Sequence, residues 1–183
     1  MARLLRRYES VVYGNYRLAY VTYGVFIGVI MALVILFHRI LFAANPPLSP
    51  ENYVVDIVLA VALFVASYRY RSTLPGGQVM LKELLLLGIG MGAVASVVYG
   101  LLLWIICGAL FPDLVETFIS HRLSLMPPVS ESADAALAVE NTKGYTAGDW
   151  AFIGGFRLFV MSILVTFFTS IILRTQKSLL RST

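Results

Sequence analysis

LLLLGIGMGAVASVVYGLLLWIICGAL, residues 84–110, is the stretch that decides the fold. It carries no charged side chain, and as an α-helix rising about 1.5 Å per residue it is roughly 40 Å long. The hydrocarbon core of a bilayer is ~30 Å thick, so a helix of this length crosses it with room to tilt. A strand is excluded because its unpaired edge cannot be satisfied in lipid. The segment therefore predicts a transmembrane helix.

Three further segments are long and apolar enough to cross a membrane. The second contains Asp56 and the last contains Arg157, and the first is uncharged over residues 19–37 and reaches residue 42 with His38 and Arg39 at the interface. We therefore expect an all-α fold in which residues 1–183 form a single transmembrane domain, a polytopic four-transmembrane-helix bundle. The four expected spans cover about residues 19–42, 53–68, 84–110 and 150–173.

The composition excludes a soluble globular domain. Apolar residues make up 59% of the chain and charged residues 13%, whereas a soluble domain has ~25% charged residues. The net charge is +4, but the basic residues flank the apolar spans, so membrane lipid and not nucleic acid is the expected partner. The chain has 1 cysteine and 2 histidines, which provide no disulfide and no zinc motif. We expect neither a metal nor a cofactor.

The basic residues are distributed unevenly between the two sides of the membrane. Ten of the 14 Lys and Arg residues lie in the N-terminal stretch, in the 69–83 loop or in the C-terminal tail. By the positive-inside rule, this places both termini in the cytoplasm. The basic cytoplasmic face could dock a cytoplasmic domain or anionic lipid, and a role as topology determinants alone is the other interpretation. This face comprises Arg69, Arg71, Lys82, Arg174 and Lys177.

Residues 111–149 form a sizeable aqueous segment on the other side. From Asp113 to Leu125, apolar residues recur at helical spacing, which predicts a short amphipathic external helix on the outer membrane surface. Two prolines at 127–128 end it, and residues 130–140 predict a second, weaker helix. The segment is too short to be a separate folded domain.

Small residues repeat every four positions in the first and third spans. This spacing lets helix backbones approach closely, which matters because lipid supplies no hydrophobic force between helices. We expect the first and third helices to be central. We favour packing within the chain, and packing between chains remains the alternative. The packing residues are Gly24 and Gly28 in the first span and Gly88, Gly92, Ser96 and Gly100 in the third.

Asp56 and Arg157 lie at similar depth, near the outer ends of their spans. A charge inside the membrane needs a partner, so we predict that these two side chains pair. His38 and Arg39 end the first span on the same side, and Asp149 precedes the last span. Together these residues could form an outward-facing polar pocket for a lipid headgroup or a polyprenyl phosphate. The alternative is a structural ion pair with side chains that snorkel to the interface.

Several short motifs occur in a family-like order. They are Tyr23-Gly24 in the first span, Tyr68-Arg69-Tyr70-Arg71 and Gly76-Gly77 before the third span, and Phe111-Pro112-Asp113-Leu114 after it. With this order the chain resembles the four-helix Bacteroidota membrane proteins catalogued as domain of unknown function 4199. The resemblance implies a bacterial inner (cytoplasmic) membrane and supplies no catalytic residue. Genes of that family often neighbour one for a polyprenyl-phosphate glycosyltransferase, which the resemblance therefore implies as a partner.

We expect a non-catalytic accessory or scaffold subunit of a membrane complex. Its partner would be another membrane protein, with that glycosyltransferase as one example, or a second copy of itself. The alternative is a small oligomeric lipid or ion transporter that uses an outer-leaflet site at Asp56 and Arg157. An enzyme is not expected, because the sequence has no zinc-protease motif and no nucleophile elbow.

Overall fold

The structure is a computed structural model that describes residues 2–41, 52–73, 80–126 and 133–179, with side chains for 18–41, 52–73, 80–126 and 137–173. Within these ranges the chain is helical apart from short connections, and it contains no strand. In chain order the elements are α1 (Ala2–Leu41), α2 (Tyr53–Thr73), α3 (Leu81–Ile105), the π-helical turn η2 (Ile106–Leu110), α4 (Asp113–Ser124), α5 (Ala133–Lys143) and α6 (Ala147–Leu179).

Four helices are long and apolar enough to cross a membrane, so the all-α polytopic bundle is confirmed. The clearest departure from the expected bounds is α2, which continues five residues past position 68 to Thr73. In this extra part Tyr70 is 4% exposed, and Nη1 of Arg71 donates to the backbone oxygen of Leu173 in α6 at 2.5 Å. Contacts with the bundle therefore keep residues 69–73 helical, although their charges predict a loop in water. The spans are Leu18–Leu41, Tyr53–Thr73, Leu81–Leu110 and Ala147–Leu173.

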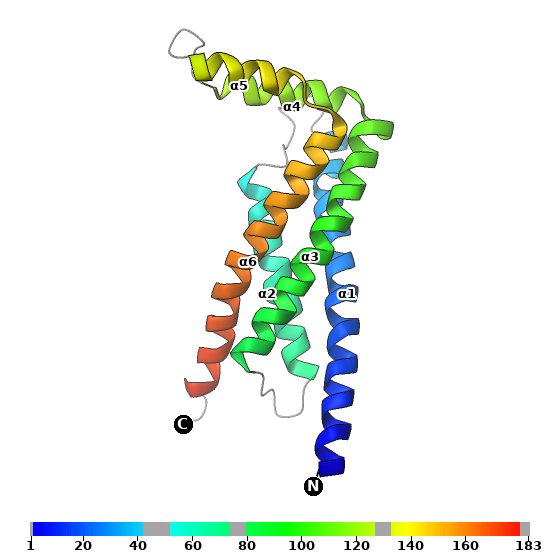
Figure 1. The fold of residues 1–183 in the computed structure, drawn as a ribbon, viewed down its shortest axis with the longest axis vertical. Coiled ribbons are helices and arrows are strands. Elements are labelled where there is room, and N and C mark those ends of the chain that lie inside the picture. The colour runs from blue at the N-terminus through cyan, green and yellow to red at the C-terminus, as the bar shows by residue number, and fades with distance from the viewer. Residues whose placement is uncertain (1, 42–51, 74–79, 127–132, 180–183) are drawn as a thin grey trace.

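The four long helices α1, α2, α3 and α6 run along the long axis of the molecule (Figure 1). α1 begins and α6 ends at the same end, which we call the terminal end. α4 and α5 lie across the opposite end, which we call the capped end (Figure 1). This arrangement separates the segment between α3 and α6 from both ends of the chain.

Small residues bring α3 into close contact with α1 and α6. A Cβ atom placed on Gly28 of α1 would lie 2.7 Å from the backbone oxygen of Ala95 in α3. A Cβ atom placed on Gly92 of α3 would lie 1.9 Å from Oγ of Ser162 in α6. The repeats therefore serve packing within the chain, as expected. The remaining members lie along the same two interfaces, Gly24 against α3 and Gly88, Ser96 and Gly100 against α6.

The core runs along the bundle axis and continues into the capped end. Its central side chains, each at most 1% exposed, are Met31, Ile35, Leu59, Leu63, Leu87, Met91, Tyr99 and Leu103. These residues come from α1, α2 and α3, and Leu158 of α6 joins them in one cluster. The interior of the bundle is therefore filled by side chains that interlock between helices.

α4 caps the bundle because its apolar face packs on protein. The π-helical turn before it is closed by Phe111, whose backbone N–H donates to the oxygen of Ile106 at 2.8 Å. In α4, Leu114 is 1% exposed and Phe118 is 0% exposed. The ring of Phe118 meets that of Trp150 in α6 edge-on, with centroids 5.3 Å apart. The expected amphipathic helix is thus present, but the bundle rather than the outer membrane surface covers these apolar residues.

Candidate functional site

Asp56 and Arg157 form the expected ion pair. Asp56 lies in the first turn of α2 and Arg157 about two turns into α6. Nη2 of Arg157 donates to Oδ2 of Asp56 at 2.5 Å. The side chains are 18% exposed for Asp56 and 31% exposed for Arg157, so the pair is half-buried near the capped end. It joins two helices that are distant in sequence.

Tyr99 of α3 is a buried polar side chain of the bundle core that sequence reasoning missed. Its side chain is 0% exposed. Its hydroxyl group has no hydrogen-bond partner among the described residues. A tyrosine within an otherwise apolar span is the signal that could have identified it.

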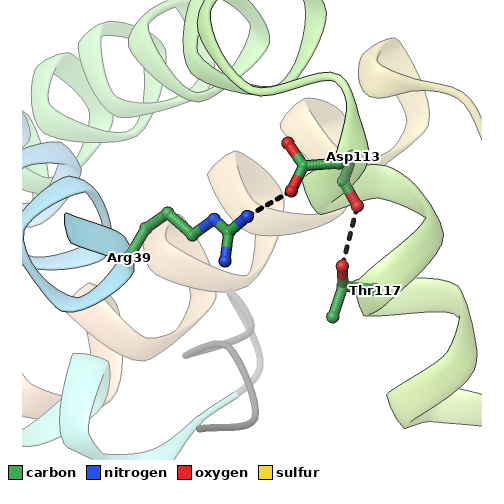
Figure 2. Close-up of polar contacts among 3 residues, drawn as sticks. All are labelled: Arg39, Asp113 and Thr117. Carbon is green, nitrogen blue, oxygen red and sulfur yellow. Dashed lines mark hydrogen bonds and ion pairs between the residues drawn. The ribbon is translucent and has the colours of Figure 1, made fainter. Parts of the chain in front are cut away.

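Arg39 does not join Asp56 and Arg157. Its guanidinium group instead pairs with the carboxylate of Asp113, the first residue of α4, as Figure 2 shows. The backbone oxygen of Asp113 also accepts a hydrogen bond from Oγ1 of Thr117 at 2.7 Å. The contact therefore joins the end of α1 to the start of the cap. Among the described contacts, Arg39 is thus found with a carboxylate of α4 rather than with the Asp56–Arg157 pair, against the expectation of a shared polar pocket.

His38 and Asp149 also lie apart from the Asp56–Arg157 pair. His38 lines a separate apolar groove of ≈ 480 Å³ with residues of α1 and Val54 of α2. Asp149 accepts hydrogen bonds from the backbone N–H and the hydroxyl of Thr146, both at 2.7 Å, and so caps the start of α6. In the described part of the chain, Arg39 and Asp149 contact Asp113 and Thr146, and His38 and Arg157 line different cavities, so the five residues predicted to share a pocket are not brought together there.

A different polar cavity lies beside Arg157 at the capped end. It has a volume of ≈ 450 Å³ and opens between α4 and the first turns of α2 and α6. Two arginines and a histidine contribute to its wall, and none of the described residues that line it is acidic. The lining residues are Asn52, Tyr53, Phe118, His121, Arg122, Leu125, Trp150 and Arg157.

Arg122 is held in the cavity wall by aromatic rings. Its guanidinium carbon lies 5.5 Å from the ring centroid of Tyr145 and 5.9 Å from that of Trp150. Cation–π contacts of this kind hold a planar guanidinium group in place. Sequence reasoning missed this cavity. The available signals were the basic end of the amphipathic helix and the seven-residue spacing that puts Trp150 and Arg157 on one face of α6.

The expected basic face is only partly a free surface. Arg69 and Lys82 are exposed at the terminal end. Arg71 is half-buried and donates to the backbone of Leu173 in α6, so it contributes to helix packing. The side chains of Arg174 and Lys177 lie outside the described part of the chain.

Replacing Arg39 with glutamine should loosen the capped end. Exposed ion pairs contribute about 0.2–1 kcal/mol, so we expect a small loss of overall stability and a clear increase in amide hydrogen exchange within α4. Asp113→Asn should give the same pattern. Lys143→Gln, which removes an exposed charge from α5, is the control and should leave exchange in α4 unchanged. Equal exchange in α4 for Arg39→Gln and the unmodified protein would contradict a role of this pair in holding the cap.

Comparison with known proteins identifies a family but no activity. The chain matches the family described as "Protein of unknown function (DUF4199)" over residues 22–175, which confirms the resemblance seen in the sequence. No curated protein and no solved structure matches the chain. The match runs from the first transmembrane helix to the last in a chain of 183 residues, and the chain therefore belongs to the DUF4199 family.

Proposed function

We propose that this protein is a non-catalytic accessory or scaffold subunit of a complex in the bacterial inner membrane. Both termini would be cytoplasmic, because the excess of basic residues lies at the terminal end. The partner class to test first is a polyprenyl-phosphate glycosyltransferase. That choice rests on the family resemblance alone and not on any contact in the bundle.

The observation that supports a structural role is the use of the charged residues. Arg157 joins α6 to α2, Arg39 joins α1 to α4, and Arg71 joins α2 to α6. Each contact fixes one helix against another instead of contributing to a common reaction centre. Within the described ranges, no three His, Cys, Asp or Glu side chains come together in a way that could hold a metal ion. Such an arrangement favours a rigid membrane scaffold over a catalyst.

The terminal end is the surface best suited to a cytoplasmic partner. Arg69 and Lys82 are exposed there and lie close to the ends of the helices that carry them, α2 and α3. Charges at the rim of an interface mainly speed association and set its salt dependence. An acidic surface on a partner, or anionic lipid, would complement them.

Native mass spectrometry of the protein, extracted gently from its own membrane, tests the proposal. We expect a second polypeptide in stoichiometric amount. Its retention should fall in Arg69→Gln/Lys82→Gln and should be unchanged in Lys143→Gln, which removes an exposed charge at the capped end. A homo-oligomer without a second polypeptide would refute the subunit role.

The second candidate is a small oligomeric lipid or ion transporter that uses Asp56 and Arg157. The cavity beside Arg157 favours it, because this cavity opens one member of the ion pair, Arg157, to the capped end. A path through one chain would have to continue past Leu59, Leu63 and Met91, which are at most 1% exposed. The filled core therefore favours the scaffold. Substrate flux into proteoliposomes that is lost in a folded Asp56→Asn variant would reverse this preference.

A further inference from the structure

We propose that the cavity at the capped end binds the phosphate of an anionic membrane-lipid headgroup. The residues that would contact it are Arg122 of α4, Arg157 of α6 and the indole N–H of Trp150. The inference goes beyond the subunit role and does not depend on it, because it concerns the isolated chain and a lipid.

The charge of the cavity wall points to an anion. Arg122, Arg157 and His121 contribute to it, and no acidic side chain appears among its described lining residues. Asp56 contacts Arg157 but does not line the cavity. Arginine presents several donors in a planar fork that matches phosphate geometry. Two such forks from different helices therefore border this half-enclosed space, with the charge of Arg157 shared with Asp56.

Trp150 provides a second and independent indication. Its side chain lines the cavity and is 0% exposed. The indole Nε1 has no acceptor among the described residues. A buried donor without an acceptor costs free energy. An oxygen atom of a ligand in the cavity would relieve this cost once the side chains that cover Nε1 shift to admit it.

The position of the cavity favours a lipid over a soluble phosphate. Tyr53 begins the second span and Trp150 lies in the first turns of the last span, so the cavity lies at headgroup depth. Aromatic residues are typical of this level of the membrane. Two of the lining side chains, Tyr53 and Leu125, are 70% and 73% exposed, and both present apolar surface that suits the glycerol and first methylenes of a lipid.

The test measures lipid binding to the purified full chain in neutral detergent. Native mass spectrometry compares retention of phosphatidylglycerol with that of phosphatidylcholine carrying the same acyl chains. We expect preferential retention of phosphatidylglycerol. Loss of one charge-assisted contact in Arg122→Gln should weaken its binding about tenfold or more. Lys143→Gln, which removes an exposed charge from the same end, should have no effect.

Two further variants separate binding from folding. Arg122→Lys keeps the positive charge but loses the planar fork and its stacking on Tyr145, so it should weaken binding less than Arg122→Gln does. Trp150→Phe keeps an aromatic ring and removes only the indole donor, and should weaken binding several-fold. Thermal unfolding of each variant establishes that the bundle remains folded.

Three results would overturn the proposal. The first is equal retention of the two lipids, and the second is an equal loss for Lys143→Gln and Arg122→Gln. The third is displacement of phosphatidylglycerol by inorganic phosphate at similar concentration, which would assign the cavity to a soluble phosphate instead of a lipid. Failure of any of these tests leaves the subunit role untouched, because that role is tested separately, by whether a second polypeptide is retained in native mass spectrometry.

Discussion

Replacing Gly28 with alanine should lower the free energy of unfolding by about 1–3 kcal/mol, the usual cost of inserting a methyl group into a packed interface. The new Cβ atom would lie 2.7 Å from the backbone oxygen of Ala95 and 2.8 Å from Cβ of Val98. Neither atom is the flexible end of a long side chain, so the clash is relieved only by moving α1 away from α3. In lipid, close packing is what holds helices together, and the displacement should therefore weaken the whole interface. Thermal unfolding in detergent measures the effect.

Gly108→Ala is the matched control. Its Cβ atom would lie 3.7 Å from Cβ of Ala147, an ordinary contact distance. Alanine is also favoured over glycine in a helix by roughly 0.5–1 kcal/mol, so this variant should be neutral or slightly more stable. The same destabilisation for both glycines would show that the effect comes from the substitution itself and not from contact between α1 and α3.

The helix packing could be predicted from the sequence because it depends on local spacing. Residues four apart share a helix face whatever the rest of the fold does. Gly24 and Gly28 therefore had to form one surface, and so did Gly88 and Gly92. The structure adds the partner of each surface, α3 for the first pair and α6 for the second.

A polar contact could be predicted only where the depth of a charge in the membrane limits its possible partners. Asp56 and Arg157 are the charges within their spans at similar depth, so each had few possible partners. Arg39 lies at a helix end, where interfacial charges are many and depth no longer selects among them. Its partner Asp113 depends on how the chain turns after the third span. That turn is set by the π-helical segment Ile106–Leu110, which the periodicity does not reveal.

The cavity at the capped end could not be predicted for a related reason. Its wall combines residues from α2, α4 and α6, and sequence spacing says nothing about where separate helices meet. The position of α4 depends on the packing of Phe118 against Trp150. An amphipathic pattern predicts an apolar face but does not say whether lipid or protein covers it.

Asp56→Asn and Arg157→Gln should each destabilise the bundle, and the two effects should not add. An exposed ion pair contributes about 0.2–1 kcal/mol, whereas breaking a buried pair costs about 3–5 kcal/mol. With side chains 18% and 31% exposed, this pair lies between these limits, and each single change should cost about 2–3 kcal/mol. The larger part of that cost is the charge left without its carboxylate or guanidinium partner at the level of the bilayer.

The double variant Asp56→Asn/Arg157→Gln removes both charges together and should cost less than the sum of the single changes. The coupling free energy should be about 1–2 kcal/mol, within the range for residues in direct contact. The Arg39–Asp113 pair is the matched comparison, because Arg39 is 26% exposed and Asp113 53% exposed. The greater exposure of its carboxylate, 53% for Asp113 against 18% for Asp56, predicts a smaller coupling.

The unmodified protein, the two single variants and the double variant Asp56→Asn/Arg157→Gln together distinguish the two proposed roles of the Asp56–Arg157 pair. If the pair is structural, the unfolding temperature falls in both single variants, and the double variant recovers part of this loss of stability. If the pair belongs to a transport site, the variants lose flux while their unfolding temperatures stay near that of the unmodified protein. Additive unfolding effects together with retained flux would contradict both roles, because neither stability nor transport would then depend on contact between these two side chains.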